Sequence, residues 1–240
     1  MIVEVCANSL QSAINAQRAG ADRIELCCEL GVGGITPSFG LLKKIKESID
    51  IPVHVLIRPR SGDFTYSEME FEVMKEDILK SKEMGFEGVV SGVLFSDFTV
   101  DIKRTSELLR LADGMTFTFH RAFDWVKDPI AALLQIEELG VNYILTSGGE
   151  SSASKGLALL KKLHKTTGDC KIMPGGGISG LNINEFIEGG FDAIHLSGSV
   201  FHRSLAGAPK VTMNSPDFLR EDFIALSDYD RIKSIVKSVK

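Results

Sequence analysis

The densest group of reactive side chains in the sequence follows a short apolar segment, residues 116–124, TFTFHRAFD. Because successive side chains of a strand point to opposite faces, the two inner phenylalanines share one face and His120 lies on the other. Arg121 and Asp124 follow in a predicted loop. This segment predicts a strand that carries chemistry at its end, where a histidine transfers protons and an arginine binds an anion.

The same alternation places polar side chains on one face of several other predicted strands. If the aliphatic residues of each strand face helices, the positions between them point to the interior. The interior positions are Glu4, Cys6, Glu25, Cys27, His54, Arg58, Thr118, His120, Thr146, His195 and Ser197. Burying carboxylates and a guanidinium costs several kcal/mol for each ion unless the charges are paired. We therefore interpret this set as a functional site.

Two of these groups differ in pKa in the way that acid–base catalysis requires. Glu25 and His120 are the candidate general base and acid, and His195 is a third candidate catalytic residue. A structural interpretation remains open, in which the two interior glutamates pair with Arg58 and His54 and His195 is a hydrogen-bonded core residue.

Cysteines end two consecutive predicted strands and form a candidate metal site. Cys6 and Cys27 are expected to be neighbours, because adjacent strands lie about 4.8 Å apart. Two thiolates at that spacing bind a soft ion such as Cu(I), although buried cysteine is also a common small apolar residue. Cys28 is expected to point the other way, and Cys170 lies at the opposite end of its strand.

Arginines and glycines near the strand ends predict an anion-binding site. Glycine lets an anion approach the backbone, and guanidinium groups bind carboxylate or phosphate with two hydrogen bonds. The candidate anion-binding residues are Arg58, Arg60, Arg121, Gly176, Gly177, Ser197 and Gly198. The alternatives are that the glycines only turn the chain and that one arginine offsets the interior glutamates.

The elements that must position these side chains form a regular alternation of strand and helix. The predicted strands are 2–6, 23–27, 52–58, 88–94, 115–120, 143–147, 171–174 and 193–197, with amphipathic helical patterns between them. We expect a single (β/α)8 TIM barrel over residues 1–240, because the interior positions are repeatedly polar. A doubly wound sheet is the alternative. An irregular excursion is expected at 202–217, before a closing helix that starts at Ser227 or Asp228.

The composition restricts the partners. A net charge of −5 without a basic stripe gives no reason to expect nucleic acid. No apolar run approaches the roughly 20 residues that cross a bilayer, and the first residues do not resemble a signal peptide. We expect a cytoplasmic protein with reduced cysteines, which binds a metal ion or a small molecule and no membrane.

Several motifs together resemble the CutC family of copper homeostasis proteins. They are VEVCA, GADRIELC, GGITPS, IPVHVLIRPRSGDFTYS, TFHRAFD, ILTSGG and HLSGS, and they cover nearly the whole chain in order. The resemblance implies a cytoplasmic TIM barrel that is a homo-oligomer, either a dimer or a tetramer, with a role in copper handling. It also implies that Cys6 and Cys27 match the proposed Cu(I) ligands.

A function of a different class follows from the polar interior. TIM-barrel enzymes place their chemistry at the carboxyl ends of the strands. The alternative function is an enzyme that acts on a small anionic metabolite, such as a phosphorylated one, and uses Glu25 and His120 to transfer protons.

Overall fold

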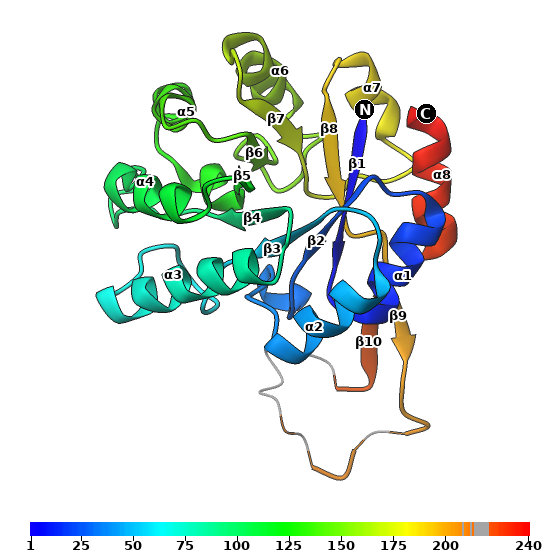
Figure 1. Cartoon of the computed structure of the whole chain (residues 1–240). Coiled ribbons are helices and arrows are strands. Elements are labelled where there is room, and N and C mark those ends of the chain that lie inside the picture. Colours follow the sequence, from blue (N-terminus) through cyan, green and yellow to red (C-terminus); the bar gives the residue numbers. More distant parts are fainter. Residues whose placement is uncertain (208, 212, 214–220) are drawn as a thin grey trace.

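The computed structural model has a central ring of parallel strands with helices around it (Figure 1). It describes residues 1–207, 209–211, 213 and 221–240. The strands of the ring are β1 (Ile2–Ala7), β2 (Arg23–Leu26), β3 (Val53–Leu56), β4 (Gly88–Ser91), β5 (Thr116–Phe119), β6 (Tyr143–Thr146), β7 (Lys171–Pro174) and β8 (Ala193–Leu196). The helices are α1 (Leu10–Ala19), α2 (Phe39–Ser48), α3 (Glu68–Glu83), α4 (Ile102–Leu111), α5 (Pro129–Glu138), α6 (Leu157–Thr166), α7 (Ile183–Glu188) and α8 (Tyr229–Val239), with short 3₁₀ helices η1 (Leu30–Val32) and η2 (Arg121–Trp125).

The strand order closes the sheet into a barrel. Neighbours follow the order β7-β6-β5-β4-β3-β2-β1-β8, and a parallel bridge between Gly175 and His195 joins the two ends. The predicted (β/α)8 fold is confirmed. The doubly wound alternative is wrong, because a doubly wound sheet would leave two open edges.

Local sequence signals explain where the helices begin. Asp128 caps α5 through its side chain and is followed by Pro129 at the first helical position, as the sequence predicts. Asp228 caps α8 in the same way. Figure 1 shows α8 beside α1, so the last helix completes the outer layer next to the first one.

Two strands end two or more residues earlier than the sequence predicts. The segment predicted as 52–58 leaves the sheet after Leu56, because Arg58 and Thr36 exchange hydrogen bonds with each other. The segment predicted as 88–94 ends at Ser91, and the Leu94 N–H instead donates to the Phe64 carbonyl. The loops after these strands therefore pack on each other and build the rim of the barrel.

A hairpin occupies part of the stretch predicted as irregular. β9 (Ser199–Arg203) pairs antiparallel with β10 (Phe223–Ser227), so the first two residues of 202–217 belong to a strand. Residues 208, 212 and 214–217 of that stretch lie outside the described residues. The Asn8 amide donates to the Ala225 carbonyl and the Ser227 N–H donates to the Ser12 hydroxyl, which fixes the hairpin beside β1 and α1.

Within the described part of the chain, no helix is long and apolar enough to cross a membrane.

Candidate metal and anion site

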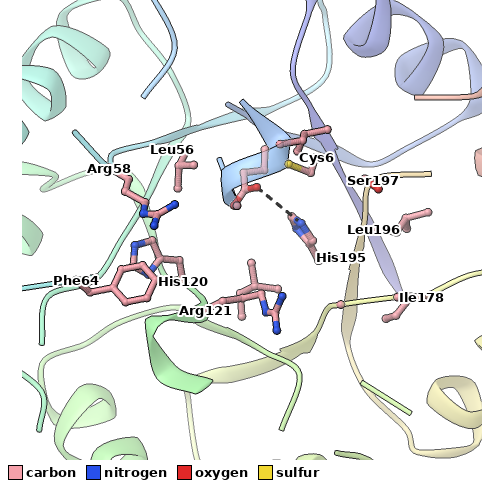
Figure 2. Close-up of a pocket in the computed structure, with 16 residues that line it drawn as sticks. Cys6, Leu56, Arg58, Phe64, His120, Arg121, Ile178, His195, Leu196 and Ser197 are labelled. Atoms are coloured by element: carbon pink, nitrogen blue, oxygen red, sulfur yellow. Dashed lines mark ion pairs between the residues drawn. The ribbon is translucent and has the colours of Figure 1, made fainter. Parts of the chain in front are cut away.

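A cavity of about 230 Å³ opens at the carboxyl ends of the strands (Figure 2). Figure 2 shows Arg58, His120 and Phe64 on one wall and Cys6 and His195 on the opposite wall. The residues selected from the sequence that line the cavity are Cys6, Glu25, Arg58, His120, Arg121, Gly176, Gly177, His195 and Ser197. The structure thus brings residues from six strands, or from the loops that follow them, into one small space.

Three of the residues selected as catalytic, metal-binding or anion-binding candidates do not line the cavity. Cys27 is fully buried behind its wall. Arg60 turns outward and forms ion pairs with Glu70 at 2.6 Å and Asp63 at 3.1 Å. Gly198 has a positive φ of +55° and packs against Ile232 of α8. An arginine in a rim loop is long enough to reach several partners, so the sequence does not decide which one it takes.

The two cysteines predicted as metal ligands are in contact. Their Sγ atoms lie 3.3 Å apart in a thiol–sulfur hydrogen bond, and both residues are buried. The hydrogen bond to Cys27 and burial raise the pKa of Cys6 well above its ordinary value. Cys28 is only half-buried and Cys170 lies just before β7, as the sequence predicts.

A buried chain of charges runs behind the cysteines. Arg23 Nε donates to Glu4 Oε2 at 2.6 Å, and Glu4 Oε1 lies 2.8 Å from His195 Nδ1. Burial alone would raise the pKa of Glu4, but Arg23, His195 and His54 together lower it to about 2. Glu4 is therefore a carboxylate at neutral pH, held by a cation on one side and an imidazole on the other.

His195 connects this row of buried charged groups to the cavity. Its Nε2 lies 3.7 Å from Glu25 Oε2. Burial would lower the pKa of His195, but the charges of Glu25 and Glu4 outweigh burial and raise it. Burial is also the main reason that the pKa of Glu25 is raised. Ligand atoms of Cys6, Glu25 and His195 lie within 4.8 Å of one another, which makes this group a candidate metal site.

Arg58 is a buried cation with an unusual set of partners. Its guanidinium donates to the carbonyls of Val32, Gly34 and Gly62, and its side chain forms no ion pair among the described residues. Its Nε has no hydrogen-bond partner in the same part of the chain. A guanidinium that is 5% exposed and lines a cavity, with no carboxylate within ion-pair distance among the described residues, favours an anionic ligand there.

Arg121 is the second guanidinium of the cavity, and Asp124 positions it. Arg121 Nε donates to Asp124 Oδ2 at 2.8 Å, while Asp124 Oδ1 accepts hydrogen bonds from the Ser147 and Gly149 N–H groups. The guanidinium also donates to the Ser147 hydroxyl. Arg121 lies beside Gly176, whose φ of +100° is open only to glycine at low cost.

The two histidines on the β3 and β5 side are neutral. Burial and the charge of Arg58 lower the pKa of His120 to about 3, and burial with the charge of Arg23 lowers the pKa of His54 to about 4. His120 Nδ1 accepts a hydrogen bond from the Ala122 N–H, and its ring lies 4.9 Å from Phe64. Neutral His120 thus offers a buried imidazole next to Arg58.

Sequence reasoning missed two residues of the site. Arg23 lies two residues before Glu25 on the same strand, so the alternation also places its side chain on the interior face. Its pairing with Glu4 was nevertheless not expected. The internal ion network proposed as the structural alternative exists around Glu4, but its cation is Arg23 and not Arg58. Asp124 was placed in the predicted loop and was given no role. The structure shows that it accepts a hydrogen bond from Arg121 and so positions the guanidinium.

Similar proteins from several organisms belong to one family. The model of the CutC family matches residues 1–200. A CutC protein of Photorhabdus laumondii is 48% identical over 197 residues, covering 82% of this chain and 79% of the relative. A human protein named copper homeostasis protein cutC homolog is 49% identical over 189 residues, covering 78% of this chain and 69% of the relative.

Solved structures agree with these relatives. The crystal structure of a CutC copper homeostasis protein from Streptococcus agalactiae is 32% identical with a TM-score of 0.77, and the match covers 82% of this chain and 98% of the other. The 3-hexulose-6-phosphate synthase of Salmonella typhimurium, at 14% identity and a TM-score of 0.56, covers 100% of this chain and 98% of its own and shares the fold alone. On these matches, the chain belongs to the CutC family of copper homeostasis proteins.

Proposed function

We propose that this protein binds Cu(I) in the cytoplasm through Cys6 and Cys27. The observation that carries the proposal is the 3.3 Å separation of the two buried Sγ atoms, of which that of Cys6 belongs to the cavity wall and that of Cys27 lies behind it. Thiolates are the ligands that Cu(I) prefers, and the human relative is named for copper homeostasis. The four cysteines are free, which suits a reducing compartment.

The sulfur separation also indicates the coordination. With metal–sulfur bonds of about 2.3 Å, two sulfurs 3.3 Å apart hold an ion at roughly a right angle. That geometry leaves room for a further ligand from the cavity side. Because the pKa of Cys6 is raised, copper must displace a proton from it, and the affinity should increase with pH.

A competition titration tests the proposal. The reduced protein is titrated with Cu(I) against a chelator of known affinity, and so are Cys6→Ser, Cys27→Ser and Cys28→Ser. Each of the first two variants should bind Cu(I) at least about tenfold more weakly, because one soft ligand is lost. Cys28→Ser is the matched control and should bind like the parent protein. Unchanged affinity in both Cys6→Ser and Cys27→Ser would contradict the proposal.

A second function, an enzyme for a small anionic metabolite, is favoured by Arg58. This guanidinium is buried, faces the cavity and forms no ion pair among the described residues. Arg121 and the glycines at 176 and 177 line the same cavity. Glu25 and His195, whose pKa values are both raised, supply groups for proton transfer, whereas the lowered pKa of His120 does not suit it for that role. The cavity volume of about 230 Å³ lies just below the roughly 300 to 1,000 Å³ of typical ligand pockets, so the ligand must be small.

A thermal-shift screen against phosphorylated sugars and small carboxylic acids tests this second function. A ligand at a hundred times its dissociation constant stabilises the folded state by about 2.7 kcal/mol. The shift should disappear in Arg58→Gln and persist in Arg60→Gln, because Arg60 points away from the cavity. If no anion shifts the transition, or if Arg60→Gln alone removes the shift, the cavity is not an anion site.

A further inference from the structure

We propose that Cys6, Glu25 and His195 form a second metal site, for a borderline divalent ion such as Zn²⁺, with an open position toward the cavity. This site shares Cys6 with the Cu(I) pair but does not use Cys27. It goes beyond the copper proposal and does not depend on it.

The donor set supports a divalent ion. Sulfur, carboxylate oxygen and imidazole nitrogen are the three ligand types that Zn²⁺ accepts, whereas Cu(I) prefers sulfur. The three ligand atoms lie within 4.8 Å of one another, and all three residues are buried. Metal bonds of about 2.0 to 2.3 Å bring such atoms to roughly 3.5 Å apart, so binding requires the side chains to close by about 1 Å.

The hydrogen bond behind His195 orients the imidazole for this role. His195 Nδ1 lies 2.8 Å from Glu4 Oε1, and Glu4 is held in turn by Arg23. A carboxylate that accepts the Nδ1–H leaves Nε2 as the nitrogen that faces Glu25. Ligating histidines usually have such a carboxylate behind them, because it fixes the tautomer and the orientation of the ring.

A competing state without metal explains the same contacts. In that state His195 carries two protons and bridges Glu4 and Glu25 as an ion pair. The two states differ in the protonation of His195 and Cys6. In the metal-bound state the metal replaces the Nε2 proton of His195, and Cys6 binds the metal as a thiolate. A thiolate bound to the metal is therefore the signature to measure.

The proposed site has one coordination position that no protein ligand fills, and this position faces the cavity. Three protein ligands with a vacant position are typical of catalytic zinc, whereas structural zinc has four. Figure 2 shows Cys6 and His195 facing the space that Arg58 and Arg121 border. An anion held by these arginines would lie in the same cavity as the metal, so the ligand class is a small anion that offers an oxygen to the ion.

Titration with Co²⁺ alone, as a coloured substitute for Zn²⁺, tests the site in the copper-free full-length protein under a phosphine reductant. Binding should produce a thiolate-to-cobalt absorption band in the near ultraviolet. Cys6→Ser should remove the band, and Glu25→Gln and His195→Gln should each weaken binding at least about tenfold. Cys27→Ser should keep the band and bind Co²⁺ within about threefold of the parent, although it loses Cu(I).

Glu4→Gln adds a test of the orienting carboxylate and should weaken Co²⁺ binding about tenfold or more. Circular dichroism of each variant shows whether it is folded, and the band of the parent protein is informative even if one variant does not fold. Absence of the band in the parent overturns the proposal. It is also overturned if Cys27→Ser loses Co²⁺ as Cys6→Ser does while the folded Glu25→Gln and His195→Gln variants keep it.

Discussion

At the scale of single residues, burial decides which charges in the barrel are fixed and which are available. Glu4 and Arg23 neutralise each other at 2.6 Å with almost no exposure to solvent. Arg58 has no such partner among the described residues and borders the cavity. The first pair stabilises the interior, and Arg58 is the group that we propose recognises an anion.

Removing one member of the buried pair should be far more damaging than removing a surface charge. Arg23→Met leaves the Glu4 carboxylate buried without its cation, and the free energy of unfolding should fall by about 3 to 5 kcal/mol. Lys44→Met is the control, because Lys44 pairs with Glu47 at the surface and should change stability by less than about 1 kcal/mol. Urea unfolding measures both, and equal small losses would contradict the role assigned to Arg23.

The buried neutral histidines predict how stability depends on pH. The folded pKa values of about 3 for His120 and about 4 for His54 lie below the ordinary value of 6.5. The unfolded chain therefore takes up these protons first as the pH falls. Their contribution is fully present above pH 6.5 and is lost as the pH falls toward 4 and 3.

Urea midpoints measured at pH 7 and pH 5 test this dependence. His120→Gln should lose less stability between the two pH values than the parent protein, because one of the groups that take up a proton is gone. The same substitution at His202, which is exposed on β9, should leave the pH dependence unchanged. An unaltered dependence in His120→Gln would show that this histidine is not buried as a neutral group.

At the scale of elements, strand pairing brings the reactive side chains to one height in the barrel. In the pairing of β1 with β2 and β8, Cys6 lies opposite Glu25 and Glu4 lies opposite His195. The register therefore explains why residues almost 200 positions apart in the sequence meet. It also requires a small residue opposite each large side chain that fills the lumen. Gly88 of β4 is one such position, opposite His54 of β3.

A methyl group at Gly88 should disturb the lumen. The Cβ of alanine would lie 2.4 Å from His54 Cδ2, so the imidazole must move. Gly88→Ala should lower the free energy of unfolding by about 1 to 3 kcal/mol. Gly40→Ala in α2 is the control, because no atom there lies closer than 4.0 Å and alanine favours a helix. Thermal unfolding measures both, and a neutral Gly88→Ala would contradict the assigned packing.

At the scale of the whole molecule, the sequence predicts the direction of a side chain where a strand alternates between apolar and polar residues. It does not predict the partner of a long side chain that can reach several groups. Alternation predicted that Glu4 and His195 point inward, because a strand has two faces. It could not predict that Arg60 turns to Glu70, since a rim arginine reaches many partners. The β9–β10 hairpin was missed because neither strand alternates between apolar and polar residues: β9 (SVFHR) ends in two polar residues, and β10 (FIALS) is apolar at its first four positions.

The oligomeric state remains a prediction at this scale. We expect a dimer or a tetramer, and the rim offers apolar surface for contact. Phe95, Phe98 and Trp125 are each about half exposed beside the cavity wall formed by Phe64. Light scattering coupled to gel filtration should give the mass of two or four chains, and the mass of a single chain at all concentrations would contradict the expectation.

Binding of Cu(I) by Cys6 and Cys27 can be tested directly. Anomalous diffraction at the copper absorption edge locates the ion directly in crystals grown with Cu(I) in the absence of oxygen. We predict one strong peak within about 2.3 Å of both sulfurs, and its loss in crystals of Cys27→Ser. Copper bound only at other residues, or no peak in crystals with reduced cysteines, would contradict the claim.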